Sequence, residues 1–145
     1  MAAVTVTVAA AVAITVHLVD HAGDLPLGGP VTAASTPSQV VQQFAALSQR
    51  GSTAEAEQLL DPTSGEMTGW SGVFDHARDV SIKRETEAHL SDDDPHRFQA
   101  SVTVLLTGGR IEDGFSPGWE GPVFVHLVRD SPDQPWEITA AGTGP

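Results

Sequence analysis

Residues 80–106 read VSIKRETEAHLSDDDPHRFQASVTVLL, and the spacing of apolar side chains in this stretch indicates the fold class. Apolar and polar residues alternate over 80–90 and again over 98–106, which predicts two strands that each bury one face. The three aspartates at 92–94 predict a solvated hairpin loop between these strands. We expect pairs whose residue numbers sum to an even value, because a slip of one residue would turn every side chain to the other face.

Two further strands follow this hairpin, and helices precede it. Residues 123–129 are apolar on both faces, as expected of a central strand, and residues 136–141 form a last short strand. Thr36, followed by Pro37 and Gln39, has the pattern of a helix N-cap with a capping box. The apolar residues that follow predict a helix over 39–50.

A second and a third helix are expected between that helix and the first strand. Ser52 with Glu55 has the spacing of another capping box and predicts a helix over 55–60. The apolar residues between Trp70 and Ala77 have helical spacing and predict a short third helix. Helices followed by an antiparallel meander predict an α+β domain over 36–145, with the helices packed on a curved, mostly antiparallel sheet.

The segment before this domain is apolar. Residues 1–19 carry no charged side chain and are close to the minimum length for crossing a bilayer. We interpret them as an export signal or membrane anchor, which would place the domain outside the cytoplasm. A buried strand is the alternative, suggested by the alternation of valine and threonine over 4–8. Residues 20–35 are rich in glycine and proline and are expected to form a flexible linker.

Composition excludes several classes of site. The chain has no cysteine, which rules out disulfides, thiolate metal sites and a cysteine nucleophile. Its 19 acidic residues against 7 Lys and Arg give a net charge of −12, which argues against nucleic-acid binding. The six histidines are scattered, so we expect no metal and no cofactor.

The order of elements resembles a known superfamily. The helix over 39–50, the short helix that ends at Asp61-Pro62, the alternating strands and the closing Trp136-Glu137-Ile138 are similar to the NTF2-like (cystatin-like) superfamily. More narrowly, the chain resembles small exported NTF2-like proteins of actinobacteria that carry an N-terminal anchor. The resemblance implies a sheet wrapped around helices, with a conical pocket between them. The superfamily includes isomerases, dehydratases, cyclases, transport adaptors and secretion-system parts, so the fold leaves the function open.

Five residues are candidates for lining such a pocket. Arg84 shares the parity of the covered face, so it is either a polar anchor in the pocket or an edge residue that reaches water. His126 lies in the most apolar strand and is either a pocket base or a hydrogen-bonded structural histidine. Phe44, Trp70 and Phe74 are expected to supply the apolar lining.

No catalytic set is recognisable in the sequence. Asp75, His76 and Asp79 form a cluster of acid and base residues, for which solvated helix-end charges are the simpler interpretation. The chain has no tyrosine to act as the oxyanion donor of a ketosteroid-isomerase-like site. The leading hypothesis is a non-catalytic, envelope-associated domain that binds a protein partner or a small apolar ligand. One alternative is a SnoaL-type isomerase, cyclase or hydratase, with His126, Arg84 and Asp79 as its polar residues. The other is a self-associating subunit of a secretion or cell-wall assembly. A homodimer is left open.

Overall fold

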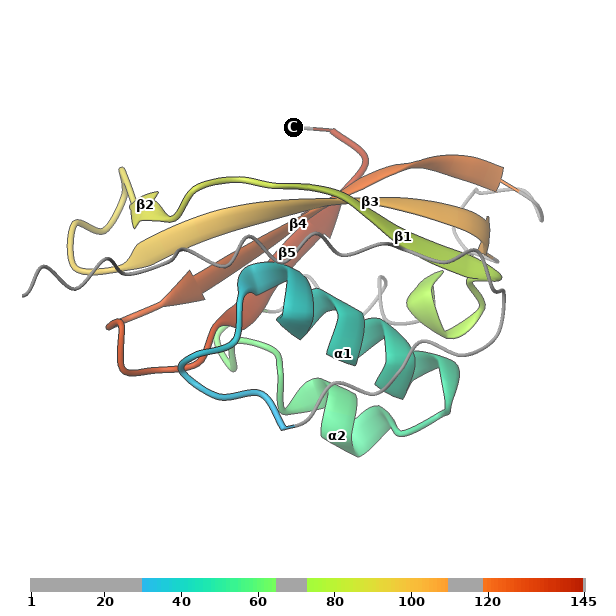
Figure 1. Ribbon diagram of the computed structural model, residues 1–145, viewed down its shortest axis with the longest axis horizontal. Helices are drawn as coiled ribbons and strands as arrows, with labels where there is room; N and C mark the ends of the chain where they lie inside the picture. The colour runs from blue at the N-terminus through green and yellow to red at the C-terminus, as the bar shows by residue number, and fades with distance from the viewer. Residues whose placement is uncertain (1–29, 65–72, 110–118, 145) are drawn as a thin grey trace, which may run out of the picture.

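The computed structural model describes residues 30–64, 73–109 and 119–144, which form a sheet with helices on one of its faces (Figure 1). The helices are α1 Pro37–Gln49 and α2 Thr53–Glu57, and Val73–Asp75 form a further helical turn. The strands are β1 Asp79–Glu85, β2 His89–Leu90, β3 Phe98–Gly109, β4 Trp119–Arg129 and β5 Glu137–Gly142. The predicted α+β class is therefore confirmed.

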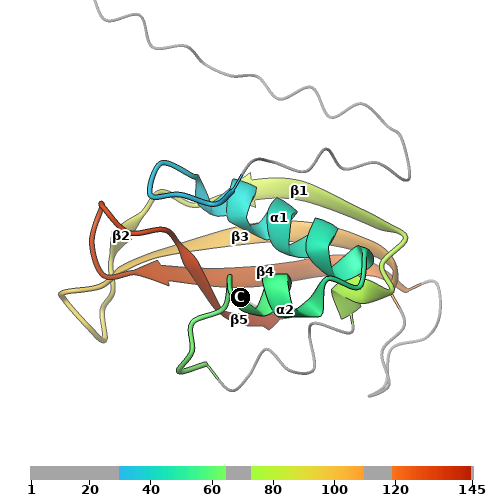
Figure 2. The ribbon, with the colours of Figure 1, turned by 90° about the horizontal axis from the view of Figure 1, so that it is seen from below.

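The sheet has five strands in the order β1-β3-β4-β5, and β2 also pairs with β3. Every neighbouring pair is antiparallel, as the predicted meander requires. Both helices lie on the same side of the sheet, as the view from below shows (Figure 2). We call the opposite side of the sheet the outer face; no described helix covers it.

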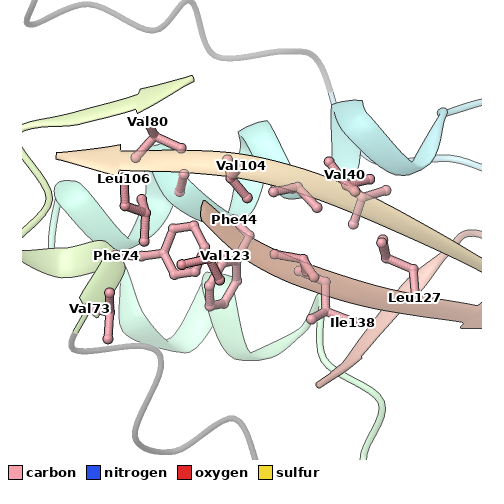
Figure 3. Packing of buried hydrophobic residues seen from close by; sticks show 14 of the residues in the cluster. Val40, Phe44, Val73, Phe74, Val80, Val104, Leu106, Val123, Leu127 and Ile138 are labelled. Atoms are coloured by element: carbon pink, nitrogen blue, oxygen red, sulfur yellow. The ribbon is translucent and has the colours of Figure 1, made fainter. Parts of the chain in front are cut away.

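The core lies between the sheet and the helices. Phe44 of α1 and Phe74 meet edge to face, with ring centroids 5.3 Å apart and ring planes at 78° (Figure 3). Alternate residues of β3 and β4 point toward them, because side chains of a strand alternate between its faces. Their burial is complete or nearly so: Ala100, Val102, Val104 and Leu106 of β3, and Val123, Val125 and Leu127 of β4.

The expectation that β4 is buried on both faces is wrong. Its outward residues Phe124 and Val128 are only partly buried, and His126 is exposed. Helices cover one side of this antiparallel sheet, so a strand can be central in the strand order and still have one face in water.

The register of the first hairpin changes at a bulge in β1. Ile82 pairs with Val104, an even sum, but Arg84 pairs with Thr103, an odd sum. Pairing returns to an even sum at Leu90 with Phe98, after residues 86–88 have left the ladder. The even-sum prediction is therefore confirmed at both ends of the hairpin and wrong in the middle. An extra residue in a strand turns the side chains that follow it to the opposite face.

The start of α1 is stabilised from two directions. The predicted capping box is present: Gln39 N donates to Thr36 Oγ1 at 3.3 Å, and Thr36 N donates to Gln39 Oε1 at 2.8 Å. Ser38 N donates to Glu85 Oε2 at 2.8 Å. The first turn has no acidic residue of its own, so Glu85 supplies the negative charge that a helix N-terminus favours. The bulge makes this contact possible, because it places Glu85 opposite the buried Val102.

The second predicted capping box does not form. Ser52 is the N-cap of α2 but makes no side-chain hydrogen bond to the helix, and the side chain of Glu55 is exposed. The helix is short, and the chain then turns through Leu59 and Leu60 to the edge of the sheet. There Ile138 N donates to Leu59 O at 2.8 Å, and Asp61 N donates to Ile138 O at 2.9 Å.

The segment before α1 also contacts the domain. Val31 is partly buried against the core, and Ser35 N donates to Thr32 O at 3.0 Å in a turn. The predicted signal or anchor over 1–19 and most of the predicted linker lie outside the described residues. No helix within the described ranges is both long and apolar enough to span a membrane.

Candidate functional site

The residues predicted to line one pocket do not come together. Phe44 and Phe74 are buried in the core at 1% and 0% exposure, where they contact each other. Arg84 is exposed on the outer face, because the bulge has reversed its parity. His126 is exposed on the same face, between Ser101 of β3 and Ala140 of β5. Trp70 lies outside the described residues.

The predicted cluster of acid and base residues is exposed. Asp75 and His76 follow the helical turn, and Asp79 begins β1 on the outer face. His126 and Asp79 are both on that open face and line neither hollow described below. These acid and base residues therefore do not meet at the floor of either hollow.

A groove lies instead between the two helices and the start of β5. Its volume is about 460 Å³. The apolar part of its wall comes from the segment before α1, from both helical regions and from the chain entering β5. The lining residues are Pro30, Val31, Gln43, Leu47, Glu55, Gln58, Leu59, Pro135, Trp136 and Glu137. We call this the helix-side groove.

Three polar side chains of this groove have atoms without a partner. Gln43 Oε1 is buried and accepts no hydrogen bond. Within the described chain, the carboxylates of Glu55 and Glu137 make neither a hydrogen bond nor an ion pair. Of these atoms, only Gln43 Oε1 is buried, and a buried acceptor without a donor costs free energy, so a donor from outside would satisfy it.

The environment of Glu137 disfavours its charge. Burial raises the pKa of its carboxyl group above the ordinary value, and the negative charges of Asp61 and Asp130 add to this effect. The positive charge of Arg97 opposes the rise without cancelling it. Glu137 therefore sits where a cation from outside would be stabilised.

A second, more polar hollow of about 430 Å³ adjoins the groove and shares Pro135 and Glu137 with it. Asp61, whose side chain is 3% exposed, lines this hollow. Asp61 Oδ1 accepts from Thr63 N at 2.8 Å and Thr63 Oγ1 at 2.7 Å, and Oδ2 pairs with Arg97 Nη2 at 3.1 Å. Arg97 Nε in turn pairs with Asp130 Oδ1 at 2.7 Å.

These contacts lower the pKa of Asp61. Burial alone would raise it, but the hydrogen bonds from Thr63 and the charge and hydrogen bond of Arg97 outweigh burial. The hydrogen bond to Asp130 raises the pKa of Arg97 still further. Asp61 therefore remains ionised and fully partnered. We assign this network a structural role, because it joins the segment after α2 to the start of β3 and the end of β4.

Arg129 also lines the second hollow. Its guanidinium carbon lies 4.4 Å from the ring centroid of Trp136 and 5.7 Å from that of Phe98. Nη1 donates to Pro132 O at 3.4 Å, and Nε is buried without a partner. Cations placed over aromatic faces are stabilised by the ring quadrupole. Arg129 thus holds Trp136, and with it one wall of the helix-side groove, in position.

The described side chains of the two hollows do not have the arrangement of a metal site. No group of three or more His, Asp or Glu side chains within the described ranges is arranged to hold a metal ion. In the second hollow, Arg97 bridges the carboxylates of Asp61 and Asp130.

Comparison of the chain with protein-family models, with curated proteins and with solved structures gives no match. A function for the chain has therefore to be inferred from its own residues.

Proposed function

We propose that this chain is a non-catalytic binding domain that takes a small apolar ligand in the helix-side groove. The observation that carries the proposal is the combination of an apolar wall with a buried, unpartnered amide oxygen in one hollow. Ligand pockets share this composition, a mostly apolar lining with a few polar groups that set orientation.

The packed core supports a binding role over the isomerase alternative. The inward residues of β3 and β4 are 0–3% exposed, and they fill the space in which the superfamily resemblance would place a conical pocket. Arg84 and His126 lie on the outer face. An enzyme of that kind needs an acid or base within reach of substrate inside a cavity.

The cellular location of the domain and its relationship to the NTF2-like superfamily form part of the same proposal. We propose an extracytoplasmic domain, attached or exported through residues 1–19, whose fold is a variant of the NTF2-like plan. An uncharged N-terminal segment supports the first part, and helices on one face of an antiparallel sheet support the second.

The test is binding of N-phenyl-1-naphthylamine, a neutral apolar dye whose fluorescence increases when it leaves water. We expect saturable binding by the native chain. Leu59→Gln, which makes the groove wall polar, is expected to weaken binding about tenfold, equivalent to about 1.4 kcal/mol. The matched control is Leu90→Gln, because Leu90 is 51% exposed on β2 and lines neither hollow. Absence of binding by the native chain, or equal loss in both variants, refutes the proposal.

A self-associating subunit is the second candidate. It is favoured by one observation, the partly exposed Leu105, Phe124 and Val128 on the outer face. Sedimentation of the native chain and of Phe124→Lys distinguishes this candidate. A dimer that becomes monomeric in the variant supports it, and a native monomer at high concentration excludes it.

A further inference from the structure

The charges that face the helix-side groove have one sign. Among the described residues that line it, Glu55 and Glu137 are the ionisable ones, and none of these is a lysine, arginine or histidine. Glu55 comes from α2 and Glu137 from β5, so two separate elements present carboxylates to one hollow.

Nearby cations do not neutralise these carboxylates. Arg97 lies in the adjoining hollow, but Asp61 and Asp130 already bind its guanidinium group. The guanidinium group of Arg129 stacks on Trp136 and donates to a backbone oxygen. The groove thus keeps uncompensated negative charge beside apolar side chains.

From these contacts we infer that the helix-side groove selects ligands that carry a protonated amine on an apolar body. This inference rests on the binding function proposed above and specifies its ligand class. The apolar body would contact Val31, Leu47 and Leu59, and the ammonium group would lie by Glu137 and Glu55.

Three further properties agree with this assignment. An ammonium group is a donor without an acceptor, and Gln43 Oε1 is an acceptor that lacks a donor. The last side-chain torsion of glutamine is soft, so the amide can turn to meet a donor. The net charge of −12 also attracts cations to the molecule and repels anions.

The experiment compares three ligands with the same apolar body and different head groups: n-octylamine, 1-octanol and octanoate. Each displaces N-phenyl-1-naphthylamine from the native chain at pH 7 and physiological salt. We expect octylamine, which is protonated at this pH, to bind about fivefold more tightly than octanol, the effect of about 1 kcal/mol for a partly exposed ion pair. Octanoate is expected to bind most weakly.

Glu137→Gln identifies the residue that recognises the head group. It should remove the advantage of octylamine over octanol. Glu120→Gln is the matched control, because it changes the net charge equally but lies exposed on the outer face. If octanoate binds as tightly as octylamine, or if both variants lose the same affinity, the inference is wrong. If dye and octanol bind but octylamine has no advantage, the inference fails while the proposed function stands. If nothing binds, the proposed function fails.

Discussion

Removing the carboxylate of Asp61 should destabilise the domain far more than removing that of Asp130, although Asp130 makes the shorter contact with Arg97. The two Arg97 contacts measure 3.1 Å to Asp61 and 2.7 Å to Asp130. The side chains differ in exposure, 3% for Asp61 and 63% for Asp130. Burial, and not contact length, is expected to set the energetic cost.

The magnitudes follow from these exposures. Breaking a buried ion pair by removing one partner costs about 3–5 kcal/mol. Asp61→Ala belongs at the lower end, about 3 kcal/mol, because Arg97 is itself 29% exposed and keeps Asp130 as a partner. Asp130→Ala removes an exposed pair, which is worth about 0.5 kcal/mol. At about 4–8 °C per kcal/mol for a domain of roughly 100 residues, Asp61→Ala lowers Tm by about 12–24 °C.

Urea unfolding followed by circular dichroism measures both variants at pH 7 and again in acid. The lowered pKa of Asp61 means that its contribution is present at neutral pH and is lost as pH falls through the folded-state pKa. The difference between native chain and Asp61→Ala should therefore shrink in acid. Equal losses for the two aspartates at pH 7, or an Asp61 penalty that is unchanged in strong acid, would refute the reasoning.

Three other predictions concern stability. Glu137→Gln should stabilise the chain at neutral pH, because a raised folded-state pKa means that the charged carboxylate destabilises the fold. Below the ordinary pKa of glutamic acid this gain in stability should disappear, and thermal melts at several pH values test it. Glu85→Ala should lower the free energy of unfolding by about 0.5–1 kcal/mol, because it removes the negative charge at the start of α1. Thr36→Ala should lower it by about 1 kcal/mol, because it removes the cap of α1. Urea unfolding measures both, and an unchanged free energy of unfolding in either variant contradicts the assigned capping. Deletion of residues 1–29 should leave Tm unchanged and deletion of residues 1–34 should lower it, because Val31 packs on the core; equal melting temperatures would show that this contact contributes nothing.

Local patterns in the sequence predicted the elements well. The N-cap at Thr36 and the start of α1 follow from side-chain chemistry within four residues, so no tertiary information is needed. The period-two alternation likewise locates β3 to within a few residues. These features depend on neighbours in the chain, which the sequence displays directly.

The side of the sheet on which Arg84 lies could not be predicted in this way. Alternation assigns a face only if the strand is regular, and a single bulge reverses every later assignment. The free carboxylate of Glu55 was missed for a related reason, since the spacing of a capping box does not guarantee that the box forms.

The helix-side groove and the second hollow were missed because their parts are far apart in the sequence. Asp61 was interpreted only as the end of a helix and Trp136 only as the start of a strand. The signal that could have drawn attention to them is the presence of Asp61 and Glu137 directly after apolar residues that must be buried, since a charged side chain there requires a partner. The partner Arg97 comes from a third segment, which only the fold identifies.

The way in which the sheet ends on each side has a consequence for its behaviour at high concentration. An edge strand with unpaired backbone groups is a template on which a second chain can add by backbone hydrogen bonds. On the β5 side, Leu59 and Asp61 already occupy such backbone groups at Ile138. On the β1 side, the bulge distorts the ladder beside the exposed charges of Lys83 and Arg84. Growth of the sheet from molecule to molecule is thereby disfavoured at both margins, so the chain should stay in solution at concentrations where a flat, uncharged margin would seed fibrils.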